Sequence, residues 1–106
     1  MRTARRIALV IAMAAVAVAA AAAQDAGAGI YKAKCQNCHG SDGMAGSGVG
    51  KIMKVKPVTD PAVKSMSEAQ MTAAVRNGLG KMQPYKDSLT DAQIKAAVEY
   101  FRAFIR

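Results

Sequence analysis

Hydrophobic and polar positions in the last part of the chain follow the period of an α-helix. The apolar positions are Ile94, Ala97, Val98, Phe101 and Ile105, and the charged positions outside them are Lys95, Glu99 and Arg102. Spacings of three and four residues put the apolar set on one helix face. Thr90 and Gln93 have the spacing of a capping box, so the helix is predicted to begin after Thr90. Its apolar stripe must pack on another element.

A second amphipathic helix is predicted between Ser67 and Gly78. Ser67 and Gln70 repeat the capping-box spacing, and Gly78 is a typical helix stop. The residues that share its apolar face are Met71, Ala74 and Val75. This helix therefore has one face available for a core.

A third helix is predicted from about residue 25 towards residue 35, although Gly27 and Gly29 lower its intrinsic propensity. A position without a side chain permits the close approach of another helix. The aromatic stripe around Tyr100 and Phe101 in the last helix is the expected partner. Close approach of that helix is therefore one reason for a position without a side chain in this segment.

Two segments between these helices are predicted to be loops. Residues 40–61 are rich in glycine, include Pro57 and Pro61, and leave room for at most a turn of helix. Residues 78–89 connect a helix stop to a helix start. Because no segment shows strand-like alternation of β-branched residues, the predicted fold class is all-α.

The first 23 residues have the pattern of a secretory signal peptide. Three arginines lie within residues 1–6, an uncharged stretch covers residues 7–20, and an A-x-A site ends at Ala23. The apolar stretch is short for a membrane span. We therefore expect residues 1–23 to be cleaved and residues 24–106 to form one domain, periplasmic or otherwise exported, without stable membrane insertion.

Composition limits the core and the partners of this domain. The 106 residues include three tyrosines, two phenylalanines and no tryptophan, and 15 Lys and Arg against 7 Asp and Glu. A chain of this size builds a thin core and commonly depends on a disulfide, a metal or a bound group. We expect no nucleic-acid binding, because the motifs of known binders are absent.

Cys35, Cys38 and His39 are the only cysteines and the only histidine of the chain. A zinc site would need about four such ligands, and a thioredoxin-like pair would need a preceding strand. A disulfide between the cysteines would close too small a loop to restrain the unfolded chain much. C-x-x-C-H is the spacing of a c-type haem attachment site, where both thiols form thioethers and the imidazole binds iron.

The second axial ligand decides between electron transfer and the binding of external ligands. The methionines that follow the predicted signal peptide are Met44, Met53, Met66, Met71 and Met82. Met71 is more readily explained as a core residue of its predicted helix, and Met44 is too close to His39 to reach the far face easily. Met53 and Met66 are not excluded.

Met82 is the expected distal ligand because of the loop in which it lies. In "GLGKMQPY", Gly78 and Gly80 let the backbone leave a helix and turn, and Pro84 restricts the chain that follows. A loop of this kind can bring one thioether to a ring.

Three segments of the chain resemble a class I monohaem cytochrome c, and specifically the small bacterial cytochrome c6 and c553 group. They are "YKAKCQNCHGSDG", "SEAQMTAAVRNGLGKMQPY" and "LTDAQIKAAVEYFRAF". The resemblance covers nearly all of residues 24–106 and implies helices wrapped round one covalently bound haem c. The matching positions are Cys35 and Cys38 for the thioethers, His39 for the proximal ligand, Met82 for the distal ligand, and Tyr100 for the aromatic residue that packs on the N-terminal helix.

The chain departs from the family pattern at two places. Gln83 separates Met82 from Pro84, whereas the ligand methionine in the family is often followed directly by proline. Residues 40–56 contain no proline, although many members have one near the carbonyl that accepts from the proximal imidazole. Some group is still expected to orient His39.

The resemblance implies a soluble, monomeric carrier of single electrons between redox proteins, and not an enzyme. Lysines in the loops predict partners with acidic docking surfaces. They are Lys51, Lys54, Lys56, Lys64, Lys81 and Lys86. One alternative is a five-coordinate haem with peroxidase-like or gas-binding activity, for which the distal polar groups would be Lys81, Gln83 or Tyr85. Another alternative is a fixed electron-transfer subunit of a larger complex.

Overall fold

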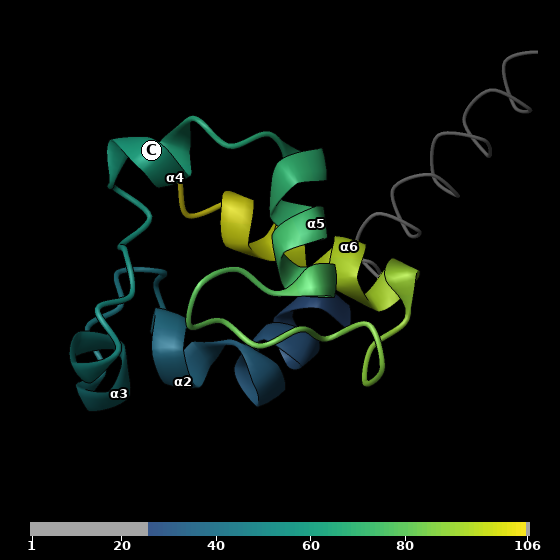
Figure 1. Ribbon diagram of the computed structural model, residues 1–106, viewed down its shortest axis with the longest axis horizontal. Helices are drawn as coiled ribbons and strands as arrows, with labels where there is room; N and C mark the ends of the chain where they lie inside the picture. Colours follow the sequence, from purple (N-terminus) through teal and green to yellow (C-terminus); the bar gives the residue numbers. More distant parts are fainter. Residues whose placement is uncertain (1–25, 106) are drawn as a thin grey trace, which may run out of the picture.

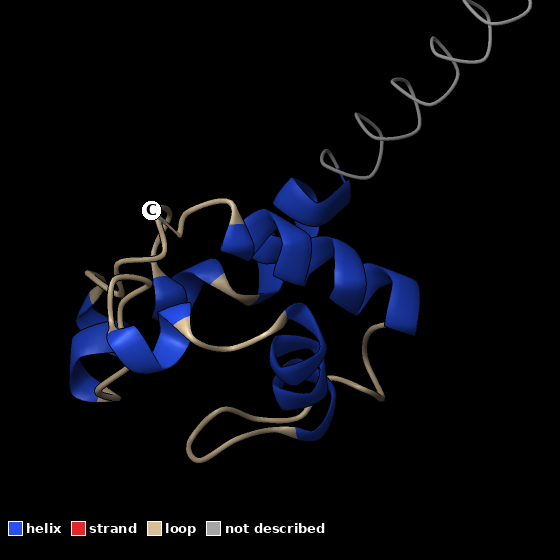
Figure 2. Ribbon diagram, turned by 90° about the horizontal axis from the view of Figure 1, so that it is seen from above, coloured by secondary structure: helices blue, strands red, loops and turns tan. Residues whose placement is uncertain are grey.

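The computed structural model describes residues 26–105, and the regular structure in this range is helical (Figure 1, Figure 2). Residues 26–34 form the N-terminal helix. It is followed by α2 (Gln36–His39), α3 (Gly48–Ile52), α4 (Pro61–Lys64), α5 (Glu68–Asn77) and α6 (Asp91–Arg102). The predicted all-α class is confirmed. The expected signal peptide, residues 1–23, lies outside the described residues.

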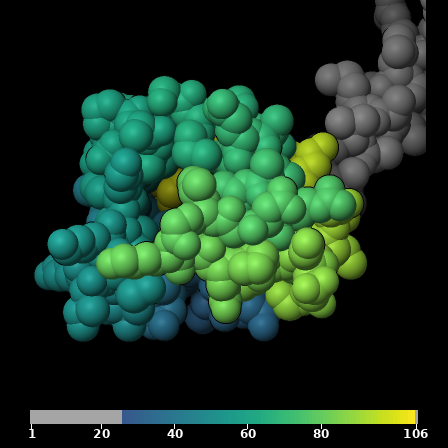
Figure 3. Space-filling view, in the orientation of Figure 1, coloured from purple at the N-terminus to yellow at the C-terminus, as the bar shows by residue number. Residues whose placement is uncertain are grey.

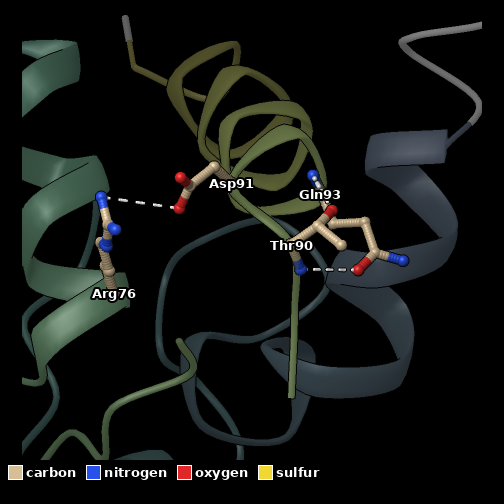
Figure 4. Close-up of polar contacts among 4 residues, drawn as sticks. All are labelled: Arg76, Thr90, Asp91 and Gln93. Atoms are coloured by element: carbon tan, nitrogen blue, oxygen red, sulfur yellow. Dashed lines mark hydrogen bonds and ion pairs between the residues drawn. The ribbon is translucent and has the colours of Figure 1, made fainter. Parts of the chain in front are cut away.

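Both predicted capping boxes form, and they fix where α5 and α6 begin. At α5 the Ser67 amide donates to Gln70 Oε1 at 2.8 Å, and the Gln70 amide donates to Ser67 Oγ at 3.1 Å. At α6 the equivalent bonds between Thr90 and Gln93 are 2.9 and 3.2 Å (Figure 4). Each box satisfies amides that the first turn of a helix leaves free.

The core lies where α6 packs on α5. Its buried cluster consists of Met71, Leu89, Ile94 and Val98. Burying an apolar side chain of this size stabilises a fold by about 1.5–3 kcal/mol. At the surface, Arg76 and Asp91 connect the same two helices at 3.6 Å (Figure 4), but an exposed ion pair contributes little. The apolar stripe therefore holds the helices together.

The N-terminal helix crosses α6 at Gly27. A Cβ atom at Gly27 would overlap the carbonyl oxygen of Ala96 and lie 3.2 Å from Tyr100 Cβ. The packing interpretation is confirmed at this position. Gly29 is not a packing position, because a Cβ atom there would meet nothing within 4 Å. The two helix positions have the same residue type but different surroundings.

The segment predicted to be a loop, residues 40–61, contains α3 and ends at the start of α4. Ser47 caps α3 by accepting from the Gly50 amide at 2.9 Å. Asp60 caps α4 by accepting from the Ala62 amide at 2.8 Å, with Pro61 at the first helical position. The sequence interpretation allowed one helical turn and missed α4, although Asp before Pro is a recognised helix start.

One residue of the predicted charged face differs from expectation. Arg102 is partly buried, and its Nη1 donates to the Met66 carbonyl at 3.1 Å. The prediction that Arg102 lies outside is wrong because the segment between α4 and α5 covers that end of α6. Long arginine side chains can pack along apolar surface while the guanidinium finds an acceptor.

Candidate functional site

One turn of helix brings the residues of the C-x-x-C-H motif together. Cys35 lies between the N-terminal helix and α2, and its amide donates to the Tyr31 carbonyl at 2.9 Å. The His39 amide donates to the Cys35 carbonyl at 3.0 Å. Both cysteines are partly buried free thiols. The chain leaves the turn at Gly40, whose φ of +80° suits glycine.

Residues outside the motif contact the backbone of His39 and Gly40 and the imidazole ring. The Ala45 amide donates to the His39 carbonyl at 2.8 Å. Tyr31, only 2% exposed, donates its hydroxyl proton to the Gly40 carbonyl at 2.6 Å. The ring of Phe101 in α6 meets the imidazole edge-on at 5.4 Å between centroids. Sequence reasoning missed these roles; the position of Tyr31 one helical turn before Cys35 is the available signal.

The imidazole of His39 has the chemical state that a metal ligand requires. Burial lowers its pKa from the ordinary value, so the ring is neutral at pH 7 and has a free electron pair. Its Nδ1 is buried and lacks a hydrogen-bond partner in the described part of the chain. Buried polar atoms are normally satisfied. The neutral imidazole of His39 can therefore serve as a ligand of haem iron.

The Cys35 thiol differs from a reactive redox cysteine. Burial, followed by the neighbouring Cys38, raises the pKa of Cys35 to about 11. It is therefore a neutral thiol at pH 7, whereas catalytic C-x-x-C pairs have a cysteine with a lowered pKa. This observation argues against thiol–disulfide chemistry at Cys35.

The segment α3 packs directly on the C-x-x-C-H turn. Ser47 Oγ donates to the Asn37 carbonyl at 2.7 Å. A Cβ atom at Gly50 would overlap the Cys38 carbonyl oxygen and lie 2.8 Å from the Ala45 carbonyl oxygen. The absence of a side chain at Gly50 thus permits this contact. The loop that follows the motif is held against α2 by α3.

Met82 closes a tight turn in the loop between α5 and α6. The Leu79 amide donates to the Met82 carbonyl at 3.1 Å, and the Met82 amide donates to the Leu79 carbonyl at 3.0 Å. Gly78 and Gly80 both have positive φ, +80° and +58°. Residues 79–82 are called the Met82 turn below. Figure 2 shows the loop standing clear of the helices, on the side that faces the viewer in Figure 1.

The other candidate methionines occupy different surroundings. Met71 is 5% exposed within the core cluster, and Met66 packs against the same cluster. Met44 is 43% exposed, and Met53 is partly buried. The side chain of Met71 is therefore committed to the core, as its helix position predicted.

A hollow lies beside the loop between α5 and α6, which contains the Met82 turn and is called the Met82 loop below. Figure 3 shows it between the teal segment that follows α3 and the green loop, with atoms of the yellow C-terminal segment at its base. Large apolar side chains are exposed on α3 and on the Met82 turn. They include Val49 at 39%, Ile52 at 79% and Leu79 at 64%. Apolar side chains exposed on these two elements are chemically suited to contact an apolar macrocycle.

The lysines that were predicted to lie in loops are all exposed. They are Lys51, Lys54, Lys56, Lys64, Lys81 and Lys86. Lys51 lies in α3 and Lys64 ends α4, whereas the other four lie in loops. All six are called the loop lysines below, after that prediction. Exposed charges of one sign raise the local concentration of oppositely charged partners.

Comparison with known proteins identifies the class. Residues 22–101 match the model of the family described as cytochrome C oxidase, cbb3-type, subunit III. The c-type cytochrome KustC0563 has a similar structure, with a TM-score of 0.68 and 27% sequence identity over 76% of this chain and 98% of that chain. No curated protein matches the chain.

The chain is a small monohaem class I cytochrome c, with the all-α fold of that class. It belongs to the cytochrome c family whose model is described as cytochrome C oxidase, cbb3-type, subunit III. It therefore carries covalently bound haem c and acts in haem-based electron transfer. The predicted class, fold and cofactor are confirmed. Within residues 26–105, no helix has the length and apolar character needed to span a membrane.

Proposed function

We propose that this cytochrome is a soluble, monomeric carrier of single electrons with a haem held by Cys35 and Cys38 and ligated by His39 and Met82. The observation that carries the proposal is the placement of His39: its partly buried imidazole follows Cys35 by one helical turn, and its buried Nδ1 has no hydrogen-bond partner within residues 26–105. Haem c supplies one-electron chemistry when bound. The cysteines anchor it, and His39 provides the proximal nitrogen.

Met82 completes the ligand set in this proposal. Its turn is closed by reciprocal backbone bonds and stands on the side of the hollow. His39 and Met82 would together hold the iron in both oxidation states, so the chain would need to rearrange little when an electron is gained or lost. A methionine partner also favours electron transfer over the binding of external ligands. The chain then acts as a carrier rather than an enzyme.

We place the carrier outside the cytoplasm, in the periplasm or another exported compartment. The support is the signal-peptide pattern of residues 1–23. Cleavage would remove its apolar stretch and leave residues 24–106 free to diffuse.

A second candidate function is that of a fixed electron-transfer subunit. The observation that favours it is the name of the matched family, which describes a subunit of an oxidase. Purification distinguishes the two: a carrier elutes as a monomer, and a subunit elutes with a stoichiometric partner.

The first test of the ligand set is the absorption spectrum of the oxidised holoprotein. We expect low-spin haem with the weak long-wavelength band of sulfur bound to ferric iron, called the sulfur–iron band below. A high-spin spectrum without this band would contradict Met82 ligation and favour the five-coordinate alternative.

The loop lysines are expected to accelerate reaction with anionic partners. The rate of oxidation of the reduced protein by hexacyanoferrate(III), an anion, should fall as ionic strength rises, because salt screens exposed charges. Lys81→Glu should slow this reaction about two- to fivefold at low salt. Lys95→Glu is the matched control, since Lys95 lies on α6. Equal effects of both variants would show that net charge, and not the loop lysines, sets the rate.

A further inference from the structure

We propose that Tyr85 is a positioning residue that fixes the Met82 turn to the haem-attachment segment, an inference that rests on Met82 being the distal ligand. The Tyr85 hydroxyl donates to the Lys34 carbonyl at 3.2 Å, across 51 positions of sequence. Lys34 directly precedes Cys35. One side chain therefore connects the loop of the distal ligand to the segment that carries the thioethers and the proximal ligand.

The backbone of Tyr85 gives this connection a fixed base. Its amide donates to the Val75 carbonyl at 2.9 Å, near the end of α5. Its carbonyl accepts from the amides of Ser88 at 3.0 Å and Leu89 at 2.8 Å, just before α6. The ring itself is partly buried against the core cluster. The main chain and the ring are thus held independently of the hydroxyl.

Gln83, the residue directly after Met82, also bonds to the Tyr85 hydroxyl. Its Nε2 donates to the Tyr85 hydroxyl oxygen at 3.3 Å. The hydroxyl accepts this bond and donates its own proton to Lys34. Gln83 also stands where the resemblance would place a proline directly after the ligand methionine. The chain of bonds runs from the residue after Met82 to the residue before Cys35.

The Met82 turn needs such an external support. Glycine loses more conformational freedom on ordering than any other residue. Gly78 directly precedes the turn, and Gly80 lies within it. The two backbone bonds between Leu79 and Met82 close the turn but do not fix its place relative to α2. A neutral hydrogen bond that provides this placement shifts an opening equilibrium by about two- to tenfold.

The test compares ferric holoprotein with its Tyr85→Phe variant, using imidazole as the ligand that competes with Met82. Phenylalanine keeps the ring packing and removes the hydroxyl. The imidazole dissociation constant should fall about two- to tenfold, because the turn opens more readily. The sulfur–iron band should persist without imidazole. Gln83→Ala should lower the same constant by a smaller factor and provides a second variant if Tyr85→Phe does not accumulate.

Ser65→Ala is the matched control, because it removes another exposed hydroxyl-to-carbonyl bond of 3.2 Å, from Ser65 to the Ala62 carbonyl, on a residue with no part in the site. Its imidazole affinity should match that of the unmodified protein. An unchanged constant in Tyr85→Phe, or an equal fall in Tyr85→Phe and Ser65→Ala, would overturn the positioning role. Survival of the sulfur–iron band in Met82→Ala would overturn the ligand assignment and this inference together. Loss of the band there with no effect of Tyr85→Phe would overturn this inference alone.

Discussion

Met82→Ala holoprotein is expected to lose the sulfur–iron band and to have a reduction potential lower by about 100 mV or more. The thioether is a soft ligand that stabilises ferrous iron relative to ferric iron, so its removal favours the oxidised form. Covalent attachment through Cys35 and Cys38 should survive, because neither cysteine is changed. Spectra of both oxidation states and a redox titration measure the two effects.

Met44→Ala is the matched control for this result. Met44 belongs to the loop after the C-x-x-C-H motif and is 43% exposed, so its loss should leave the band and the potential unchanged. A band that persists in Met82→Ala would show that another thioether binds the iron. Met53→Ala and Met66→Ala would then identify it, since Met71 is committed to the core.

Helix starts were predictable because their signals are local. The Ser67 and Thr90 boxes each depend on residues three apart, and both form as predicted. The start of α4 had an equally local signal in Asp60 and Pro61, which the sequence interpretation did not use. The packing of Gly27 and Gly29 was not local. Only the orientation of α6 decides which of the two glycines meets a neighbour.

The site shows the same division between local and distant information. Cys35, Cys38 and His39 could be identified from five consecutive residues, because the motif forms within one helical turn. The contact of Phe101 with His39 and the bond from Tyr85 to Lys34 join segments far apart in sequence. No periodicity or cap encodes such pairs. They depend on how α6 and the Met82 loop pack on the N-terminal helix.

An aromatic cluster couples the helix crossing to the site. Tyr31 of the N-terminal helix lies 5.2 Å from Tyr100, 6.2 Å from Phe101 and 5.7 Å from Phe104, centroid to centroid. Phe101 contacts His39, and Tyr31 holds the carbonyl of the next residue, Gly40. Burial, mainly, raises the pKa of Tyr31 far above its usual range, so its hydroxyl stays protonated and continues to donate. The crossing therefore supports the proximal side of the site.

Gly27→Ala is expected to destabilise the holoprotein by about 1–3 kcal/mol, the usual cost of overpacking, because its methyl group would overlap the Ala96 carbonyl. Gly29→Ala is the matched control on the same helix. It meets nothing within 4 Å and should stabilise by about 0.5–1 kcal/mol through helix propensity. Denaturant unfolding of both variants measures the difference. If both variants were stabilised equally, the helix crossing at Gly27 would be refuted. If Gly27→Ala lowered the free energy of unfolding and Gly29→Ala raised it, close packing, and not helix propensity, would explain the glycine at position 27.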